Sequence, residues 1–274
     1  MTHVACNETS ELIDQLAGLC PGIDSHDSVA VQPKVTALTA WLDESFGKMA
    51  VVAGAKRIQV SDRIEKSILE KAGFFESFSA EKLVDGNDSD ARTPAVCYQC
   101  YPHLARRELD ELGLWTCVAE CGRNEDQLGI GRFRIFHMRE IVLVGSGQRV
   151  HDEREVWMSK ISRFAQSLGL DAALQPATDC FFAAAETRGR RLLQQVKGLK
   201  FELRISGDGP CAGLAIASFN LHETFFARRF GLKLHSGSEA YSGCIAFGLE
   251  RWALALIQKL GLDRACALAG VRPT

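Results

Sequence analysis

Two neighbouring runs of alternating polar and apolar residues constrain the fold more than any other feature of the sequence. They cover residues 114–125 and 132–144, and a short loop containing Gly129 and Gly131 joins them. A period of two is typical of strands, and two such runs joined by a short loop are typical of an antiparallel pair. We therefore expect an antiparallel sheet to organise the rest of the chain.

The alternation sorts the side chains of these runs onto two faces. One face carries Cys121, Arg123, Glu125, Arg132, Arg134, Phe136, Met138, Glu140 and Val142. The opposite face of the second run carries Phe133, Ile135, His137, Ile141 and Leu143, which are mostly apolar and suit a core. The first face combines cations, an aromatic ring and carboxylates, which is an unusual composition for a bare solvent face.

The spacing on the first face fits an extended ligand. At about 3.3 Å per residue, Phe136 and Glu140 lie roughly 13 Å apart, which is similar to the length of an adenylated amino acid. Phe136 would stack on the adenine, Arg123 and Arg132 would neutralise phosphates, and Glu140 would help to hold an amine. The alternative is an exposed face with ordinary Arg–Glu cross-strand pairs. The pattern alone leaves both interpretations open.

Composition limits the classes of protein to consider. A chain of 274 residues can bury a substantial core in one or two domains. Its 32 Lys and Arg residues nearly balance 34 Asp and Glu residues, so we expect no basic nucleic-acid-binding stripe. No apolar run approaches membrane-spanning length and the N-terminus lacks a signal-peptide pattern, which predicts a cytoplasmic protein without membrane association. The 10 cysteines should then be reduced, mostly as core residues with a few metal ligands.

Shorter patterns predict further elements. In the first half we expect helices before Pro21 and after Pro33, a short strand over 49–53, a helix over 61–73 with Ser61 as N-cap, and a polar loop over 85–93. In the second half we expect a helix over 151–169, a strand over 199–205, a strand and helix within 217–232, and a strand over 241–247 followed by a helix.

Three motifs resemble one enzyme family. C-G-R-N-E, followed by a loop and R-x-x-x-F, resembles motif 2 of the class II aminoacyl-tRNA synthetases. The continuation F-H-M-R-E is similar to the amino acid:carrier-protein ligases, truncated relatives of seryl-tRNA synthetase that load an amino acid onto a phosphopantetheine thiol. F-N-L-H-E-T-F-F-A-R-R resembles a seryl-tRNA synthetase segment, and the glycines before Arg251 resemble motif 3. T-D-C-F-F at 178–182 matches a further family signature without a derivable role.

The resemblance implies a fold and a set of site residues. The fold would be α+β, with residues 1–274 forming a single class II catalytic domain of mostly antiparallel sheet flanked by helices. Residues 1–55 would be a poorly matched N-terminal helical segment. The implied ATP-binding residues are Arg123, Glu125, Arg132, Phe136, Glu202, Ser218, Asn220 and Arg251, with Arg123 and Arg251 as the catalytic pair. Cys97, Glu140 and Cys244 would hold zinc with one open position for a substrate amine, and Mg²⁺ would accompany ATP. For Glu202, a solvated salt pair is an equally good interpretation.

A rival metal site uses four cysteines. Cys97, Cys100, Cys117 and Cys121 have the C-x2-C and C-x3-C spacing of a structural zinc site. If Cys117 and Cys121 lie on one strand, they are about 13 Å apart, too far to share an ion. A redox pair formed by Cys97 and Cys100 remains open, although no thioredoxin-like context supports it.

The resemblance also implies an activity. The chain would convert a small amino acid such as glycine or alanine into an aminoacyl adenylate and pass it to a phosphopantetheinylated carrier protein, working as a homodimer. Transfer to tRNA is disfavoured because residues 1–55 contain neither sustained heptads nor a basic block. The alternatives are a seryl-tRNA synthetase-like enzyme, an adenylate-forming step of secondary metabolism, and a non-catalytic paralogue with a binding or regulatory role.

Overall fold

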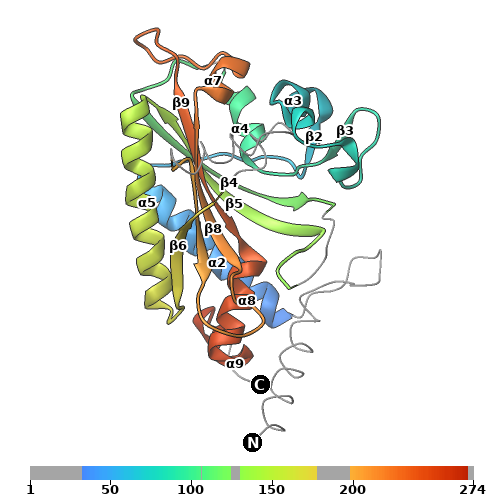
Figure 1. The fold of residues 1–274 in the computed structure, drawn as a ribbon, viewed down its shortest axis with the longest axis vertical. Coiled ribbons are helices and arrows are strands. Elements are labelled where there is room, and N and C mark those ends of the chain that lie inside the picture. The colour runs from blue at the N-terminus through green and yellow to red at the C-terminus, as the bar shows by residue number, and fades with distance from the viewer. Residues whose placement is uncertain (1–32, 106, 125–129, 178–197, 271–274) are drawn as a thin grey trace, which may run out of the picture.

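A seven-stranded sheet forms the centre of the protein, as the computed structural model shows for residues 33–105, 107–124, 130–177 and 198–270 (Figure 1). The strand order is β1-β4-β5-β9-β8-β7-β6, and every pair is antiparallel except β1 with β4. The strands are β1 (Lys56–Arg57), β4 (Leu112–Gly122), β5 (Ile135–Gly145), β6 (Ala172–Pro176), β7 (Lys200–Ile205), β8 (Ala215–Glu223) and β9 (Tyr241–Gly248). The predicted antiparallel pair is therefore confirmed as β4 and β5.

Four helices, three of them long, cover one face of this sheet. They are α2 (Pro33–Val52), α5 (Gly147–Ser167), α8 (Leu249–Leu260) and α9 (Leu262–Leu268). Their apolar residues form one core cluster with Ile141 and Leu143 of β5 and with Ile245 and Phe247 of β9. Each fully buried aliphatic side chain of this kind contributes about 1.5–3 kcal/mol to folding. The predicted helices over 151–169 and after Pro33 are confirmed, and α2 is longer than expected.

Short elements cover part of the opposite face. They are α3 (Lys66–Lys71), α4 (Cys97–Leu104), α7 (Phe225–Phe230), the single-turn helices η1 (Phe74–Glu76) and η2 (Ala80–Lys82), and a small sheet of β2 (Arg63–Glu65) with β3 (Asp90–Arg92) (Figure 1). Their apolar residues join Met138, Val142 and Val144 of β5 in a second core cluster. Strand β5 is therefore buried on both faces, whereas the sequence predicted a core on one face only.

Three local predictions for the first half of the chain are wrong. Residues 49–53 belong mostly to α2 rather than to a strand, and Gly47 within that helix faces the guanidinium of Arg139. Residues 61–73 do not form one helix, because 63–65 pair with 90–92 as strands and α3 begins only at Lys66. Residues 90–92, expected in a loop, form the partner strand. The predicted helix before Pro21 lies outside the described residues.

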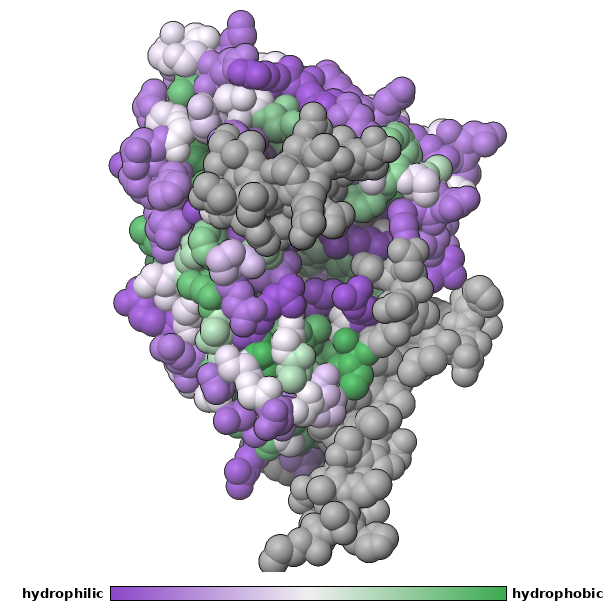
Figure 2. Space-filling model, viewed as in Figure 1, coloured by the Kyte–Doolittle hydropathy of each residue, from purple (hydrophilic) through white to green (hydrophobic). Residues whose placement is uncertain are grey.

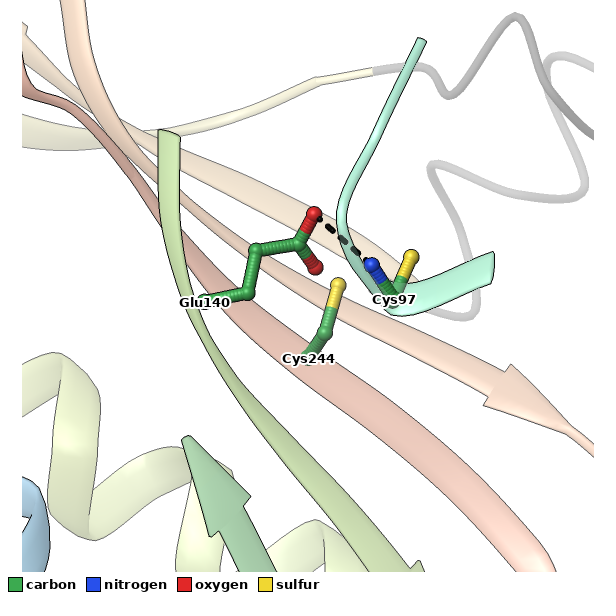
Figure 3. Close-up of side chains that lie close together, drawn as sticks. All are labelled: Cys97, Glu140 and Cys244. Atoms are coloured by element: carbon green, nitrogen blue, oxygen red, sulfur yellow. Dashed lines mark hydrogen bonds between the residues drawn. The ribbon is translucent and has the colours of Figure 1, made fainter. Parts of the chain in front are cut away.

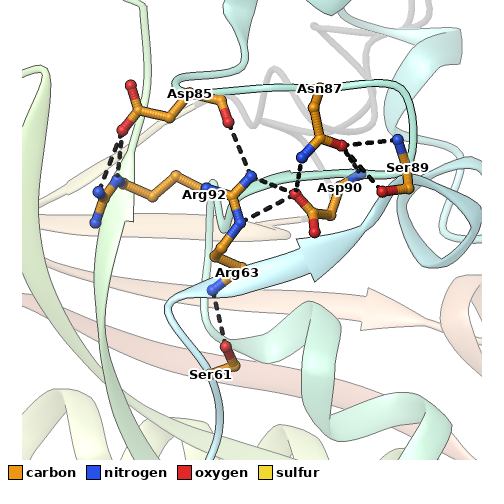
Figure 4. A network of polar contacts seen from close by, with 7 residues as sticks. All are labelled: Ser61, Arg63, Asp85, Asn87, Ser89, Asp90 and Arg92. Carbon is orange, nitrogen blue, oxygen red and sulfur yellow. Dashed lines mark hydrogen bonds and ion pairs between the residues drawn. The ribbon is translucent and has the colours of Figure 1, made fainter.

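A polar network explains why the 63–65 segment is extended (Figure 4). Arg63 donates through Nε to Asp90 Oδ1 at 3.0 Å and through Nη2 to the carbonyl oxygen of Asp85 at 3.0 Å. Asn87 Oδ1 accepts from the backbone N–H groups of Ser89 and Asp90 at 2.8 and 2.9 Å, which closes the turn before β3. The contacts of Arg63 join residues distant in sequence, and they override a local helical pattern.

Hydrophilic side chains predominate on the face of the molecule seen in Figure 2, and the apolar side chains show in separate patches. Among the described residues, no helix is both long enough and apolar enough to cross a bilayer.

Candidate active site

A cleft lies on the sheet face that α4 and α7 cover only in part. Among its lining residues are Cys97, Arg123, Phe136, Glu140, Glu202, Ser218, Asn220, Cys244 and Arg251. These are the sequence-predicted site residues except for Arg132 and Glu125. The cleft also takes in Tyr98, Phe133, Met138, Lys200, His222 and Glu250. The structure therefore brings most of the predicted residues to one surface.

Strand register explains this convergence. Phe136, Met138 and Glu140 are spaced by two on β5 and line the cleft together, as the alternation predicted. On β8, Ser218, Asn220 and His222 follow the same period, and on β7 so do Lys200 and Glu202. Glu202 pairs with Ser218 across β7 and β8, while Asn220 pairs with Cys244 across β8 and β9. Neighbouring strands therefore present polar groups to the same side.

Cys97, Glu140 and Cys244 form the buried end of the cleft (Figure 3). Glu140 and Cys244 come from β5 and β9, whereas Cys97 is the first residue of α4. Their ligand atoms all lie within 4.8 Å of one another. In the described part of the chain, this is the one group of three His, Cys, Asp or Glu residues with the spacing of a metal site.

The environment of Glu140 fits a cation. Its Oε1 accepts from the backbone N–H groups of Val96 and Cys97 at 2.9 and 3.3 Å. Its Oε2 is buried and makes no hydrogen bond. Burial raises the pKa of Glu140, while a hydrogen bond to Cys244 and burial raise the pKa of Cys97 well above its ordinary value. Such a buried, incompletely bonded carboxylate beside two thiols is costly unless a cation neutralises it.

The donor set indicates which cation fits. Two thiolates and one carboxylate suit zinc, which prefers four ligands and whose catalytic sites leave one position open. Zinc binding would displace the protons of the two thiols. The residues present therefore fit the zinc site that the family resemblance implied.

The four-cysteine zinc site is excluded by the geometry. Cys117 and Cys121 both lie on β4, as expected. Cys100 Sγ lies 3.3 Å from Cys117 Sγ, and Cys97 belongs instead with Glu140 and Cys244. Cys97 and Cys100 are both free, buried cysteines in the structure. Cys100 and Cys117 are fully buried, and their mutual hydrogen bond together with burial raises the pKa of Cys100 well above its ordinary value, so this thiol is an unreactive core group.

Arginine and phenylalanine side chains occupy the other end of the cleft. The guanidinium of Arg123 lies over the ring of Phe136, 5.4 Å from its centroid, and its Nε donates to the carbonyl oxygen of Pro94 at 2.7 Å. Arg251, in the first turn of α8, donates to the carbonyl oxygens of Gly131 at 2.7 Å and Ala215 at 3.2 Å. Backbone carbonyls therefore fix the direction of both guanidinium groups, which suits them to bind an anion in one orientation.

Glu202 forms salt pairs and also lines the cleft. Its carboxylate pairs with Lys200 at 3.2 Å and with Arg204, so it is part of a salt-bridge network. The side chain is nevertheless only 13% exposed and lines the cleft. The neighbouring Asn220 donates to Ser218 Oγ at 3.2 Å and to Cys244 Sγ at 3.4 Å, and its own Oδ1 is buried without a hydrogen bond.

Two predicted residues do not join the described cleft. Arg132 is exposed and is not among the residues that line it. Strand β5 begins at Ile135, so the alternation that assigned Arg132 to the strand face ends before it reaches that residue. Glu125 lies outside the described residues, as does the 178–182 segment.

The sequence did not predict that Lys200, His222 and Glu250 line the cleft. His222 is 6% exposed, and burial together with the charge of Lys200 lowers its pKa to about 3. The spacing of Ser218, Asn220 and His222 by two on one strand was the available signal. The two arginines of the F-F-A-R-R segment, Arg228 and Arg229, pair with Glu239 and Glu76 and do not line the cleft.

Comparison with solved structures identifies the fold. The seryl-tRNA synthetase of M. kandleri, solved with A. aeolicus tRNASec, superposes with a TM-score of 0.75 over 91% of this chain and 57% of its own, at 17% identity. The ATP complex of seryl-tRNA synthetase from Pyrococcus horikoshii gives a TM-score of 0.71 over 96% of this chain and 63% of its own, at 14% identity. The fold is that of a class II aminoacyl-tRNA synthetase catalytic domain.

No protein-family model matches the chain. Two kinds of curated protein are nevertheless similar to it in sequence. Amino acid–acyl-carrier-protein ligase 1 of Bradyrhizobium diazoefficiens is 36% identical over 66% of this chain and 56% of the relative. A type-2 serine–tRNA ligase of Methanococcus aeolicus is 26% identical over 62% of this chain and 34% of the relative. The chain is a homologue of the amino acid–acyl-carrier-protein ligases and of the seryl-tRNA synthetases. It spans just over half the length of the ligase it matches.

Proposed function

We propose that this protein activates an amino acid with ATP and transfers it to the phosphopantetheine thiol of a carrier protein. The observation that carries the proposal is the arrangement of one cleft, with a metal-type triad at its buried end and two anchored arginines with an aromatic ring at the other. An aminoacyl adenylate has matching chemistry at its two ends, an amine and a nucleotide phosphate.

Cys97, Glu140 and Cys244 would hold zinc and thereby select the amine end of the substrate. When bound, zinc supplies a Lewis acid that favours a neutral α-amine over a hydroxyl group as its additional ligand. Neighbouring side chains limit the space beside this triad, because Tyr98, His222 and Phe226 line the same cleft and are buried. A small amino acid is therefore the proposed substrate.

Activation needs positioning and charge stabilisation rather than a general base. The substrate carboxylate is already ionised at neutral pH, so its oxygen attacks the α-phosphorus of ATP and the bond to the pyrophosphate leaving group breaks. Arg123 would stabilise the charge on the α-phosphate while Arg251 binds the β- and γ-phosphates. Phe136 would stack on the adenine, with Glu125 accepting from its amino group as the family resemblance implies. Mg²⁺ would neutralise phosphate charge, with Glu202 as its candidate protein ligand.

The second step transfers the acyl group. The thiol sulfur of the carrier attacks the acyl carbon of the mixed anhydride, AMP leaves with the bonding electron pair, and the thiol proton is released to solvent. Carrier-protein transfer is preferred because the matched carrier-protein ligase is 36% identical, whereas the matched serine–tRNA ligase is 26% identical. The tRNA in the M. kandleri complex makes tRNA the second candidate acceptor. We further propose that the protein works in the cytoplasm as a homodimer.

Retention of the charged groups argues against a non-catalytic paralogue. Arg123 and Arg251 are held by backbone carbonyls within the cleft, and Glu140 remains buried at an energetic cost. A binding protein that had lost catalysis would have no reason to keep this combination.

Amino-acid-dependent exchange of pyrophosphate into ATP tests the activation step. We expect exchange with glycine, alanine or serine for the wild type, and a strong loss for Cys244→Ala. The matched control is Cys266→Ala, which removes a buried thiol from α9 that is not among the residues lining the cleft. Equal exchange in wild type and Cys244→Ala would remove the metal from the mechanism. Transfer of labelled amino acid to a phosphopantetheinylated carrier, compared with tRNA, decides the acceptor.

A further inference from the structure

Two buried side chains connect Cys244 to α4. His222 Nε2 lies 3.7 Å from Cys244 Sγ, and the Tyr101 hydroxyl lies 3.0 Å from His222 Nδ1. Tyr101 is 0% exposed and His222 6%. The chain Tyr101–His222–Cys244 therefore runs from helix to strand to strand through the protein interior.

Aromatic packing fixes both rings. Tyr101 stacks on Phe226 at 4.3 Å between centroids and on Phe230 at 5.8 Å. His222 meets Phe226 edge-on at 4.9 Å. Rotation of either ring would disrupt this stack, so the imidazole keeps its edge directed at the sulfur.

The hydrogen-bonding chemistry of Cys244 and Tyr101 determines which imidazole nitrogen of His222 carries the proton. A ligating cysteine is a thiolate, which can only accept a hydrogen bond. The neutral imidazole donates from one nitrogen and accepts at the other, so donation to sulfur requires the proton on Nε2 and acceptance at Nδ1 from the tyrosine hydroxyl. Asn220 Nδ2, which is also only a donor, lies 3.4 Å from the same sulfur. Two N–H groups therefore converge on Cys244.

We propose that Tyr101 and His222 are positioning residues for the metal site, directing an N–H donor at the Cys244 thiolate beside that of Asn220. This inference rests on the proposed zinc site. N–H donors at a ligating sulfur hold its orientation and withdraw charge from it, so they set both the metal affinity and the Lewis acidity of the ion. Tyr101 contributes by fixing which imidazole nitrogen carries the proton.

Zinc affinity and a cobalt spectrum test the proposal on the full chain. Zinc affinity is measured by competition with a chromogenic chelator, and Co²⁺ substitution reports sulfur-to-metal charge transfer in the near ultraviolet. We expect His222→Leu to weaken zinc binding about 10–100-fold, the usual effect of losing an outer hydrogen-bond partner, and to shift the charge-transfer band. Tyr101→Phe, which keeps the ring stack, should weaken binding about fivefold, the equivalent of one neutral hydrogen bond.

Two further variants separate positioning from packing. His222→Gln places a side-chain N–H near the position of Nε2, so it should recover most of the affinity and the wild-type band. Phe74→Leu removes a buried aromatic ring of the same core cluster, and the ring contacts of Phe74 in the described part of the chain are with Phe75, Phe78 and Tyr98, so it should leave both readouts unchanged. Thermal melts identify which variants are folded, and if His222→Leu does not fold, Tyr101→Phe and His222→Gln decide the question.

The outcomes distinguish this inference from the proposed site. If the wild type binds no zinc, the metal site itself fails. If the wild type binds zinc and folded His222→Leu or Tyr101→Phe matches its affinity and its cobalt band, the positioning role is overturned. An equal loss in Phe74→Leu would also overturn it, because the effect would then be one of general core packing.

Discussion

Replacing Glu140 with glutamine separates the charge of the proposed metal ligand from its shape. The amide oxygen of the glutamine can still accept from the Val96 and Cys97 backbone N–H groups, because glutamine has the same size as glutamate. The change removes only the negative charge and alters the one atom of this side chain that makes no hydrogen bond. Glu140→Gln should therefore fold normally and lose metal affinity.

The linkage between zinc binding and folding gives the expected size of the change in zinc-dependent stability. At free zinc 100 times above the dissociation constant, the wild type gains about 2.7 kcal/mol in its free energy of unfolding. Zinc sites of four ligands bind with about 10–16 kcal/mol, so losing one ligand costs on the order of 3 kcal/mol, or roughly 100-fold in affinity. At the same zinc concentration the variant would then gain only about 0.4 kcal/mol. For a chain of this length the zinc-induced Tm shift falls from roughly 5–10 °C to about 1 °C.

Thermal unfolding with and without zinc measures this difference. Glu202→Gln is the matched control, since it neutralises another carboxylate of the cleft outside the triad and should keep the full wild-type shift. A zinc-induced shift in Glu140→Gln as large as that of the wild type would refute the assignment of Glu140 as a ligand.

Three further changes have defined outcomes. Arg123→Ala should lower kcat/KM for pyrophosphate exchange about 10²–10³-fold through loss of transition-state charge stabilisation, with an unchanged circular dichroism spectrum; an unaffected rate would remove Arg123 from the mechanism. A hydrogen bond to Glu250 raises the pKa of His137. The contribution of this pair to the free energy of unfolding is therefore fully present below the ordinary pKa of 6.5, and it is lost as pH rises through the raised pKa. His137→Gln should abolish this pH dependence in urea unfolding, and an identical pH profile in the variant would contradict the assignment. The hydrogen bond from Arg63 lowers the pKa of Asp90, so Arg63→Ala should return the Asp90 pKa toward 3.8 in an NMR titration, and no change would mean that the pair does not form in solution.

Residue patterns of period two predicted the functional strands well. β4, β5, β7 and β9 begin and end within a few residues of the expected positions, because alternation reflects a sheet with different environments on its two faces. The same alternation placed Phe136 and Glu140 on one surface. The resemblance to the synthetase motifs then suggested roles for these residues, which the alternation alone could not assign.

Local patterns failed where long-range contacts decide the backbone. Residues 61–73 have a helical apolar spacing, yet pairing with 90–92 makes the first part a strand. Residues 49–53 are apolar and flanked by glycines, yet they extend a helix that packs on β5. Secondary structure in such segments depends on partners that are remote in the sequence.

By itself, the sequence determined the strand pair, the order of the motifs and the chemical character of one face, because these depend on residue types at short and regular spacings. The family resemblance named Cys97, Glu140 and Cys244 together, but only the tertiary structure shows their ligand atoms close to one another and shows the contacts of Tyr101 and His222 behind Cys244. The physical reason is that these groups come from one helix and three neighbouring strands. Sheet register and the packing of α4 on β5 bring them together, and neither is encoded in any short stretch of chain.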